Sequence, residues 1–244
     1  MPEEWSAVAI SFIYSFSILA AYYIMRPIRD QLAVEAGSAQ LPWFFAYTFL
    51  ATLVLTPMFS WLVSRWHRRV VMPVVYVFFI ACQLIFIFLF NEPDLLTIRN
   101  LGILFFVWVS VFNLFVISVF WSFMADIWND LQARRLFPII ALGGTTGALT
   151  GPIITRSLVE VLGLSYLLVV SIGFLIISLA CILSLENWAH KYGANRNISS
   201  NEAAIHGGML DGLKQIFSNS FIARMSIMML LSDAIGTIAY VLVT

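Results

Sequence analysis

The stretch "LGILFFVWVSVFNLFVISVFWSFM", Leu101 to Met124, decides the fold class of this protein. It contains no charged residue, and as a helix it is long enough to cross the ~30 Å hydrocarbon layer of a bilayer. The composition agrees, because 61% of the 244 residues are hydrophobic and 11% are charged, against about 25% charged residues in soluble domains. A soluble fold could not bury that much apolar surface, so we expect lipid around most of the chain.

Apolar runs of about 20 residues, the length of a membrane-spanning helix, recur along the chain. Each is expected to be a helix, since an unpaired backbone amide or carbonyl in lipid is very costly. The sequence therefore predicts an all-α fold, a polytopic membrane helix bundle. The seven predicted spans are residues 7–27, 43–63, 70–90, 101–124, 136–156, 164–185 and 221–243.

Basic residues are concentrated in the turns on one side of this predicted bundle. The turns after the second, fourth and sixth spans contain Arg65, Arg68, Arg69, Arg134, Arg135, Lys191, Arg196 and Lys214. The opposite turns contain fewer, namely Arg26, Arg29, Arg99 and Arg156. Because Lys and Arg favour the cytoplasmic side, the amino terminus is predicted to be cytoplasmic, in a multi-pass protein of the cell inner (plasma) membrane. Acidic and basic residues balance at 13 each, so no nucleic-acid partner is expected.

The pattern divides the chain into three regions. Residues 1–185 are predicted to form a six-span bundle, residues 186–219 a cytoplasmic linker, and residues 220–244 the seventh span. The linker is expected to end in a short amphipathic surface helix. Its apolar face consists of Met209, Leu210, Leu213, Ile216 and Phe217. Six spans, a linker and a new span describe half of a two-bundle transporter, so we expect a second bundle that this sequence lacks.

The turn between the second and third spans, "SWLVSRWHRR" (Ser60 to Arg69), resembles the loop signature of the major facilitator superfamily. That signature reads glycine-x-leucine-x-aspartate-arginine-x-glycine-arginine-arginine. The residues that match it are Leu62, Arg65, Arg68 and Arg69, and the residues that depart from it are Ser60, Ser64 and His67. Ser64 replaces the aspartate, which removes the charge pairing that the loop makes in the superfamily. A merely basic cytoplasmic turn is the alternative interpretation.

The fifth predicted span contains "GALTGPIIT", Gly147 to Thr155, which resembles the glycine-x-x-x-glycine-proline motif of exchangers in the same superfamily. Gly143, Gly147 and Gly151 recur every four residues, so they share one helical face and let a neighbouring helix approach closely. Pro152 removes one backbone donor and favours a bend in the helix. Helix packing alone and a role in exchange are both consistent with this motif.

Two further stretches are "YYIMRPIRD", Tyr22 to Asp30, and "VFWSFMADIWNDLQARRLFP", Val119 to Pro138. Both are similar to the bacterial and plastid ATP/ADP translocase (nucleotide transporter) family. By this resemblance Arg29 and Asp30 fall on the family's lysine-aspartate pair, of which the lysine is implicated in substrate handling. Gln132 departs from the family, because it lies where the nucleotide exchangers have a functional glutamate. Residues of matching type are Phe120, Trp121, Phe123, Asp126, Arg134, Arg135 and Pro138.

Charged residues at the end of the first span require an explanation, because an arginine in mid-membrane costs about 2.5–3.5 kcal/mol. Tyr22, Arg26 and Arg29 are spaced i, i+4 and i+7 and so share a helical face, and Asp30 lies one turn from Arg26. The arginines either extend to the headgroups or face a hydrated cavity. In the second case Arg29 recognises an anionic substrate group with its paired donors, and Tyr22 or Tyr23 stacks or hydrogen-bonds nearby.

Three further polar residues lie inside predicted spans. Asn113 either contributes to the substrate site or hydrogen-bonds a neighbouring helix, and Gln83 is expected to pack against another helix. Asp233, halfway along the seventh span, is predicted to contact the substrate, a counter-ion or a proton. At the cytoplasmic ends we expect a gating ion-pair cluster formed by Asp126, Arg134, Arg135, Arg65, Arg68 and Arg69.

The sequence favours a secondary active transporter that moves a small organic anion by alternating access. The resemblance implies nucleotide (ATP/ADP-type) exchange as its specific form. Proton-coupled efflux of drug-like or siderophore-like compounds and a non-transporting membrane sensor or scaffold are the alternatives. No enzyme activity, cofactor or metal is expected, since His67, His190 and His206 have no cysteine or carboxylate at metal-ligand spacing. The predicted partners are the anionic substrate and the lipid bilayer.

Overall fold

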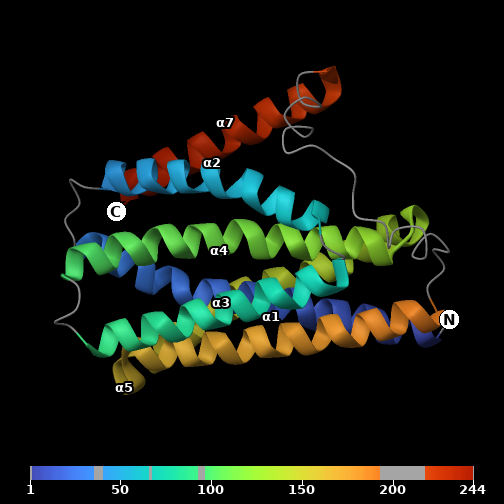
Figure 1. Cartoon of the computed structure of the whole chain (residues 1–244), viewed down its shortest axis with the longest axis horizontal. Coiled ribbons are helices and arrows are strands. Elements are labelled where there is room, and N and C mark those ends of the chain that lie inside the picture. The colour runs from blue at the N-terminus through green and yellow to red at the C-terminus, as the bar shows by residue number, and fades with distance from the viewer. Residues whose placement is uncertain (1, 36–40, 66–67, 93–96, 193–217, 244) are drawn as a thin grey trace.

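The chain folds into a bundle of long helices (Figure 1). The structure is a computed structural model that describes residues 2–35, 41–65, 68–92, 97–192 and 218–243. Over these residues it contains helices and no strand, as the sequence predicts. The helices are α1 (Pro2–Glu35), α2 (Leu41–Arg65), α3 (Arg68–Asn91), α4 (Ile98–Ile127), α5 (Asp130–Tyr192) and α7 (Ser220–Val243).

Among the residues that the structure describes, five helical segments are long and apolar enough to cross a membrane. They are Glu4–Glu35, Val71–Asn91, Arg99–Ile127, Asp130–Val161 and Gly163–Ala189. The described part of α2 contributes a shorter apolar helix, Pro42–Met58. α7 forms where the seventh span is predicted. The helices indicate a multi-pass protein embedded in a membrane.

The predicted fifth and sixth spans lie in one element, α5, which is interrupted at Gly163 (φ 79°, ψ 174°). A side chain strongly disfavours this backbone conformation, whereas glycine adopts it readily. The interruption reverses the chain, because residues on both sides of it contact α1. Thr155 donates its hydroxyl to the carbonyl of Ile24 at 3.2 Å, and Ser171 donates to the carbonyl of Ala21 at 3.1 Å. The two halves of α5 therefore pack together around α1.

α1 is longer than its predicted span, which ends at residue 27. The helix continues through Pro27 to Glu35, because residues beyond the proline still pack against α4. Ile28, Leu32 and Ala33 are buried. A Cβ atom at Gly102 of α4 would lie 3.2 Å from the carbonyl oxygen of Leu32, so the two backbones approach closely there. The charged residues near the proline are consequently inside a continuous helix.

Three glycines of α5 lie directly against α1. A Cβ at Gly143 would lie 2.5 Å from the carbonyl oxygen of Phe12, and one at Gly147 would overlap the carbonyl oxygen of Phe16. A Cβ at Gly151 would meet the side chain of Tyr23 at 2.7 Å. Their common face is therefore a backbone contact surface between two helices that run in the same direction. Pro152 follows directly and lies inside α5 without ending it.

The boundary predicted at residue 185 falls inside a helix. α5 continues to Tyr192, because Leu185 and Ala189 are still buried and the ring of Trp188 lies 5.4 Å from that of Trp128. The amino terminus and the end of α5 lie at the same end of the bundle (Figure 1), here called the N-terminal end. The predicted surface helix of the linker lies outside the described residues.

Candidate functional site

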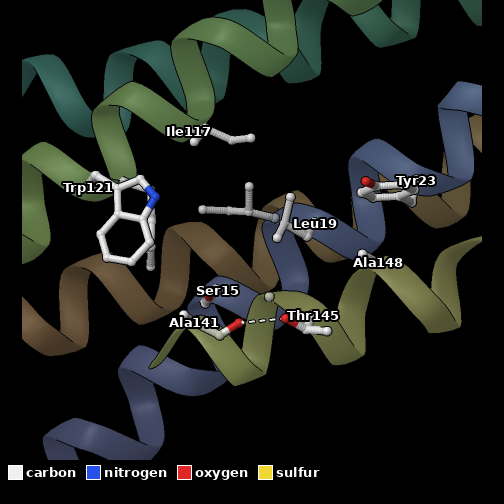
Figure 2. A pocket seen from close by; sticks show the side chains of 11 residues that line it. Ser15, Leu19, Tyr23, Ile117, Trp121, Ala141, Thr145 and Ala148 are labelled. Atoms are coloured by element: carbon white, nitrogen blue, oxygen red, sulfur yellow. Dashed lines mark hydrogen bonds between the residues drawn. The ribbon is translucent and has the colours of Figure 1, made fainter. Parts of the chain in front are cut away.

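A pocket of about 430 Å³ lies between α1, α4 and the first half of α5 (Figure 2). The side chains that line it are apolar, aromatic or hydroxyl-bearing, and none is charged. They are Ser15, Ile18, Leu19, Tyr23, Ile117, Phe120, Trp121, Ala141, Gly144, Thr145 and Ala148. Volumes of about 300–1,000 Å³ are typical of small-molecule sites, so the pocket is large enough to hold an organic ligand.

Helical periodicity brings these residues together. Ser15, Leu19 and Tyr23 are spaced by four residues on α1, and Ile117 and Trp121 have the same spacing on α4, so each set shares a face. The glycine of α5 that lines the pocket, at position 144, keeps it open. A Cβ atom at that position would lie 2.5 Å from Cδ1 of Leu19 and 2.9 Å from Oγ of Ser15.

The charged cluster of Arg26, Arg29 and Asp30 continues the pocket face of α1 toward the end opposite the N-terminal end. Arg29 donates from Nε and Nη2 to Oδ1 of Asp30 at 2.9 and 2.8 Å. Nε of Arg26 lies 3.9 Å from Oδ2 of the same carboxylate. Asp30 thus bridges both arginines but holds Arg29 much more closely.

The two arginines differ in their surroundings. The Arg29 guanidinium lies over the ring of Phe106 at 4.7 Å, and its Nη1 is 3.5 Å from Oγ of Ser110. Its side chain is 11% exposed, whereas that of Arg26 is 38% exposed. The sequence favours Arg29 as the substrate-recognising cation. In the structure its side chain contacts α4 and Asp30. Arg26 is the more accessible cation of the pair.

The two predicted tyrosines connect this cluster with the pocket. Tyr22 is buried, and its ring meets that of Tyr23 edge-on, with centroids 5.0 Å apart. Tyr23 lines the pocket and lies under the guanidinium of Arg26, whose Cζ is 5.6 Å from the ring centroid. Such a cation–π contact contributes about 0.5–1 kcal/mol at an exposed site. Tyr23 is thus the predicted site residue that touches both features.

The other polar residues predicted to act within spans occupy different places. Asn113 lies on α4 one turn from Ile117, and its Oδ1 is buried with no hydrogen-bond partner among the described residues. Gln83 connects α3 to the rest of the bundle, since its Nε2 donates to Oγ of Ser171 at 3.1 Å. Asp233 lies on α7 with an exposed side chain.

At the N-terminal end, a carboxylate that sequence reasoning missed accepts two hydrogen bonds. Oε1 of Glu4 accepts from Nη2 of Arg135 at 2.7 Å and from Nε2 of Gln132 at 3.2 Å. Asn129 and Gln132 also exchange backbone-to-side-chain hydrogen bonds at 2.9 and 3.3 Å, which is a capping box at the start of α5. The contacts of Glu4 with Gln132 and Arg135, here called the latch, join the first turn of α1 to the first two turns of α5.

The remaining residues of the predicted gating cluster are only partly described. Asp126 is half-buried near the end of α4, and Arg134 is exposed in the first turns of α5. Arg65 ends α2 and Arg68 begins α3. The side chains of Arg65, Arg68 and Arg69 lie outside the described residues.

Sequence reasoning also missed most of the pocket. No local sequence pattern marks Ser15 or Thr145 as a pocket residue, because single hydroxyl residues are common in apolar helices. Only a resemblance singles out Trp121, because its 38% exposure is set partly by residues of other helices, such as Phe137, which no local pattern reveals. Within the described part of the chain, no three His, Cys, Asp or Glu side chains lie where they could hold a metal ion.

Comparison with family models, curated proteins and solved structures gives no match for this chain.

Proposed function

We propose that this protein is a secondary active transporter that moves a small organic anion by alternating access, with nucleotide (ATP/ADP-type) exchange as its specific form. The single observation that carries the proposal is the junction of the uncharged pocket with the cluster of Arg26, Arg29 and Asp30 through Tyr23. A multi-pass bundle with such a junction can hold an amphipathic anion within the thickness of the membrane.

Arg26 is the proposed anion-binding residue. Its side chain is more exposed than that of Arg29, and its contact with Asp30 is 3.9 Å rather than 2.8 Å. A phosphate or carboxylate could therefore accept paired donors from Arg26. Arg29 acts as a positioning residue, because it holds Asp30 and so limits how far that carboxylate competes for Arg26.

The test is counter-exchange by the full-length protein in proteoliposomes. Vesicles loaded with ADP should accumulate labelled ATP, and empty vesicles should not. Uptake that does not depend on an internal nucleotide would reject the nucleotide exchange. If carboxylates and phosphate esters were also not exchanged, the transport proposal would fail.

Variants at the cluster test the residue roles. Arg26→Gln is expected to lower exchange at least tenfold, whereas Arg26→Lys should retain part of it, because the charge remains but the paired donors are lost. The matched control is Arg99→Gln, since Arg99 is exposed in the first turn of α4 at the same end of the bundle. A loss of exchange that is equal in Arg99→Gln would show that the effect is not specific to Arg26.

A further inference from the structure

The uncharged pocket is suited to the apolar part of an organic anion. We propose that it binds a planar aromatic ring against the indole of Trp121, while the anionic group of the same molecule lies beyond Tyr23 at Arg26. The anionic end of this inference rests on the proposed function, and the ring site rests on the pocket itself. The substrate class is thus an anion with a planar aromatic head, as opposed to a compact anion such as phosphate.

The chemistry of the lining excludes the charged part of a ligand from the pocket. Every lining side chain is uncharged, and an ion placed among apolar groups loses hydration that they cannot replace. The hydroxyls of Ser15 and Thr145 are polar groups of α1 and α5 in this lining, and Thr145 donates its own proton to the carbonyl of Ala141 at 3.2 Å. Its oxygen can therefore accept a hydrogen bond from the edge of a ring.

Trp121 offers a surface on which a ring can stack. Its neighbours Phe120 and Phe137 meet it at 73° and 60°, with centroids 5.1 and 5.5 Å away. Neither of these rings lies flat on the indole, which remains 38% exposed. Figure 2 shows the indole at one side of the pocket, with Leu19 and Ile117 next to the space beside it. Stacking on an aromatic side chain is favourable for any planar ring.

The dimensions require a two-ended ligand. Figure 2 places Trp121 and Tyr23 on opposite sides of the pocket. The pocket face of α1 extends from Ser15 to Tyr23, which at 1.5 Å per residue is about 12 Å of helix. Arg26 lies about 4.5 Å further along the same helix. The two distances together are about 16 Å, so a ring at Trp121 and an anion at Arg26 belong to a ligand with an extended linker between its two ends.

Calorimetric binding to the purified full-length protein in nanodiscs tests the ring site. The probes are 6-(2-naphthyloxy)hexyl phosphate and 6-(decahydro-2-naphthyloxy)hexyl phosphate, which have the same anionic group and the same six-carbon linker but differ in whether the ring is planar and aromatic. The aromatic probe is expected to bind at least tenfold more tightly. Trp121→Leu should remove this preference and Trp121→Phe should keep most of it. Trp43→Leu is the matched control, because Trp43 is exposed on α2 away from the pocket.

The results separate this inference from the proposed function. Equal binding of the two probes, or a Trp121→Leu variant that weakens both alike, would overturn the ring site even if nucleotide exchange were observed. Conversely, a ring preference that disappears in Trp121→Leu would support the ring site even if exchange failed. Arg26→Gln should weaken both probes by a similar factor and leave the ring preference unchanged. A ring preference lost in Arg26→Gln would contradict separate sites for the two ends.

Discussion

Replacing Gly147 by alanine tests the packing on which the whole bundle depends. The added Cβ would overlap the carbonyl oxygen of Phe16, lie 3.0 Å from its carbonyl carbon and lie 3.1 Å from the amide nitrogen of Ala20. All three atoms belong to the backbone of α1, so no side chain can rotate away. α1 and α5 must therefore separate, which also disturbs the pocket between them.

The structure allows the cost to be compared with two related substitutions. Overpacking of this kind costs about 1–3 kcal/mol. A Cβ at Gly144 meets the ends of side chains, Leu19 and Ser15, which can move, so Gly144→Ala should cost less. A Cβ at Gly173 meets nothing within 4 Å, so Gly173→Ala should gain about 0.4–1 kcal/mol from reduced chain entropy.

Thermal unfolding of the purified variants in one detergent measures this order. A difference of about 2 kcal/mol corresponds to about 4–8 °C for a chain of this size. Gly147→Ala should unfold at the lowest temperature, Gly144→Ala at an intermediate one, and Gly173→Ala at or above the wild-type value. If Gly147→Ala were as stable as Gly173→Ala, the close approach of the two helix backbones would be refuted.

Two other contacts give predictions with internal controls. Gln132→Glu should lower thermal stability by about 0.5–1.5 kcal/mol, because the amide that donates to Glu4 becomes a second carboxylate. Glu4→Gln in the same chain should restore the stability, and an unchanged melting temperature in Gln132→Glu would contradict the latch. The buried hydroxyls of Tyr14 and Tyr76 lie 2.8 Å apart, so either single Phe substitution should cost about 1–3 kcal/mol by stranding its partner. The double substitution should cost no more than one single substitution, and strictly additive losses in a double-mutant cycle would contradict their pairing.

The sequence was sufficient to place the helices but not their ends. Apolar runs predict spans because the requirement to satisfy backbone groups in lipid acts locally. The ends of α1 and α5 depend on distant partners instead. Leu32 packs against Gly102, and the ring of Trp188 contacts that of Trp128. No local sequence pattern predicts either contact. The reversal at Gly163 falls in the turn predicted between residues 156 and 164, but the sequence did not predict that helical structure would continue on both sides of a single glycine.

The candidate site was predictable only along one helix. Periodicity placed Tyr22, Arg26 and Arg29 on one face of α1, but it could not decide which arginine Asp30 would hold. The pocket combines residues from α1, α4 and α5, so its lining cannot be predicted from any single stretch of sequence. The latch at Glu4 was missed because its partners are separated from it by 128 and 131 positions in the chain.

The charge of the Arg26–Asp30 cluster connects these findings. Two guanidinium groups and one carboxylate give a net charge of 2 − 1 = +1 on the three side chains, close to an uncharged pocket. A positive charge in such surroundings is costly, at about 2.5–3.5 kcal/mol for an arginine in mid-membrane. Asp30 offsets this cost mainly for Arg29, as the distances of 2.8 and 3.9 Å indicate. Under the proposed function, one negative charge of the substrate bound at Arg26 would bring the sum for these side chains to zero and so offset the remaining cost.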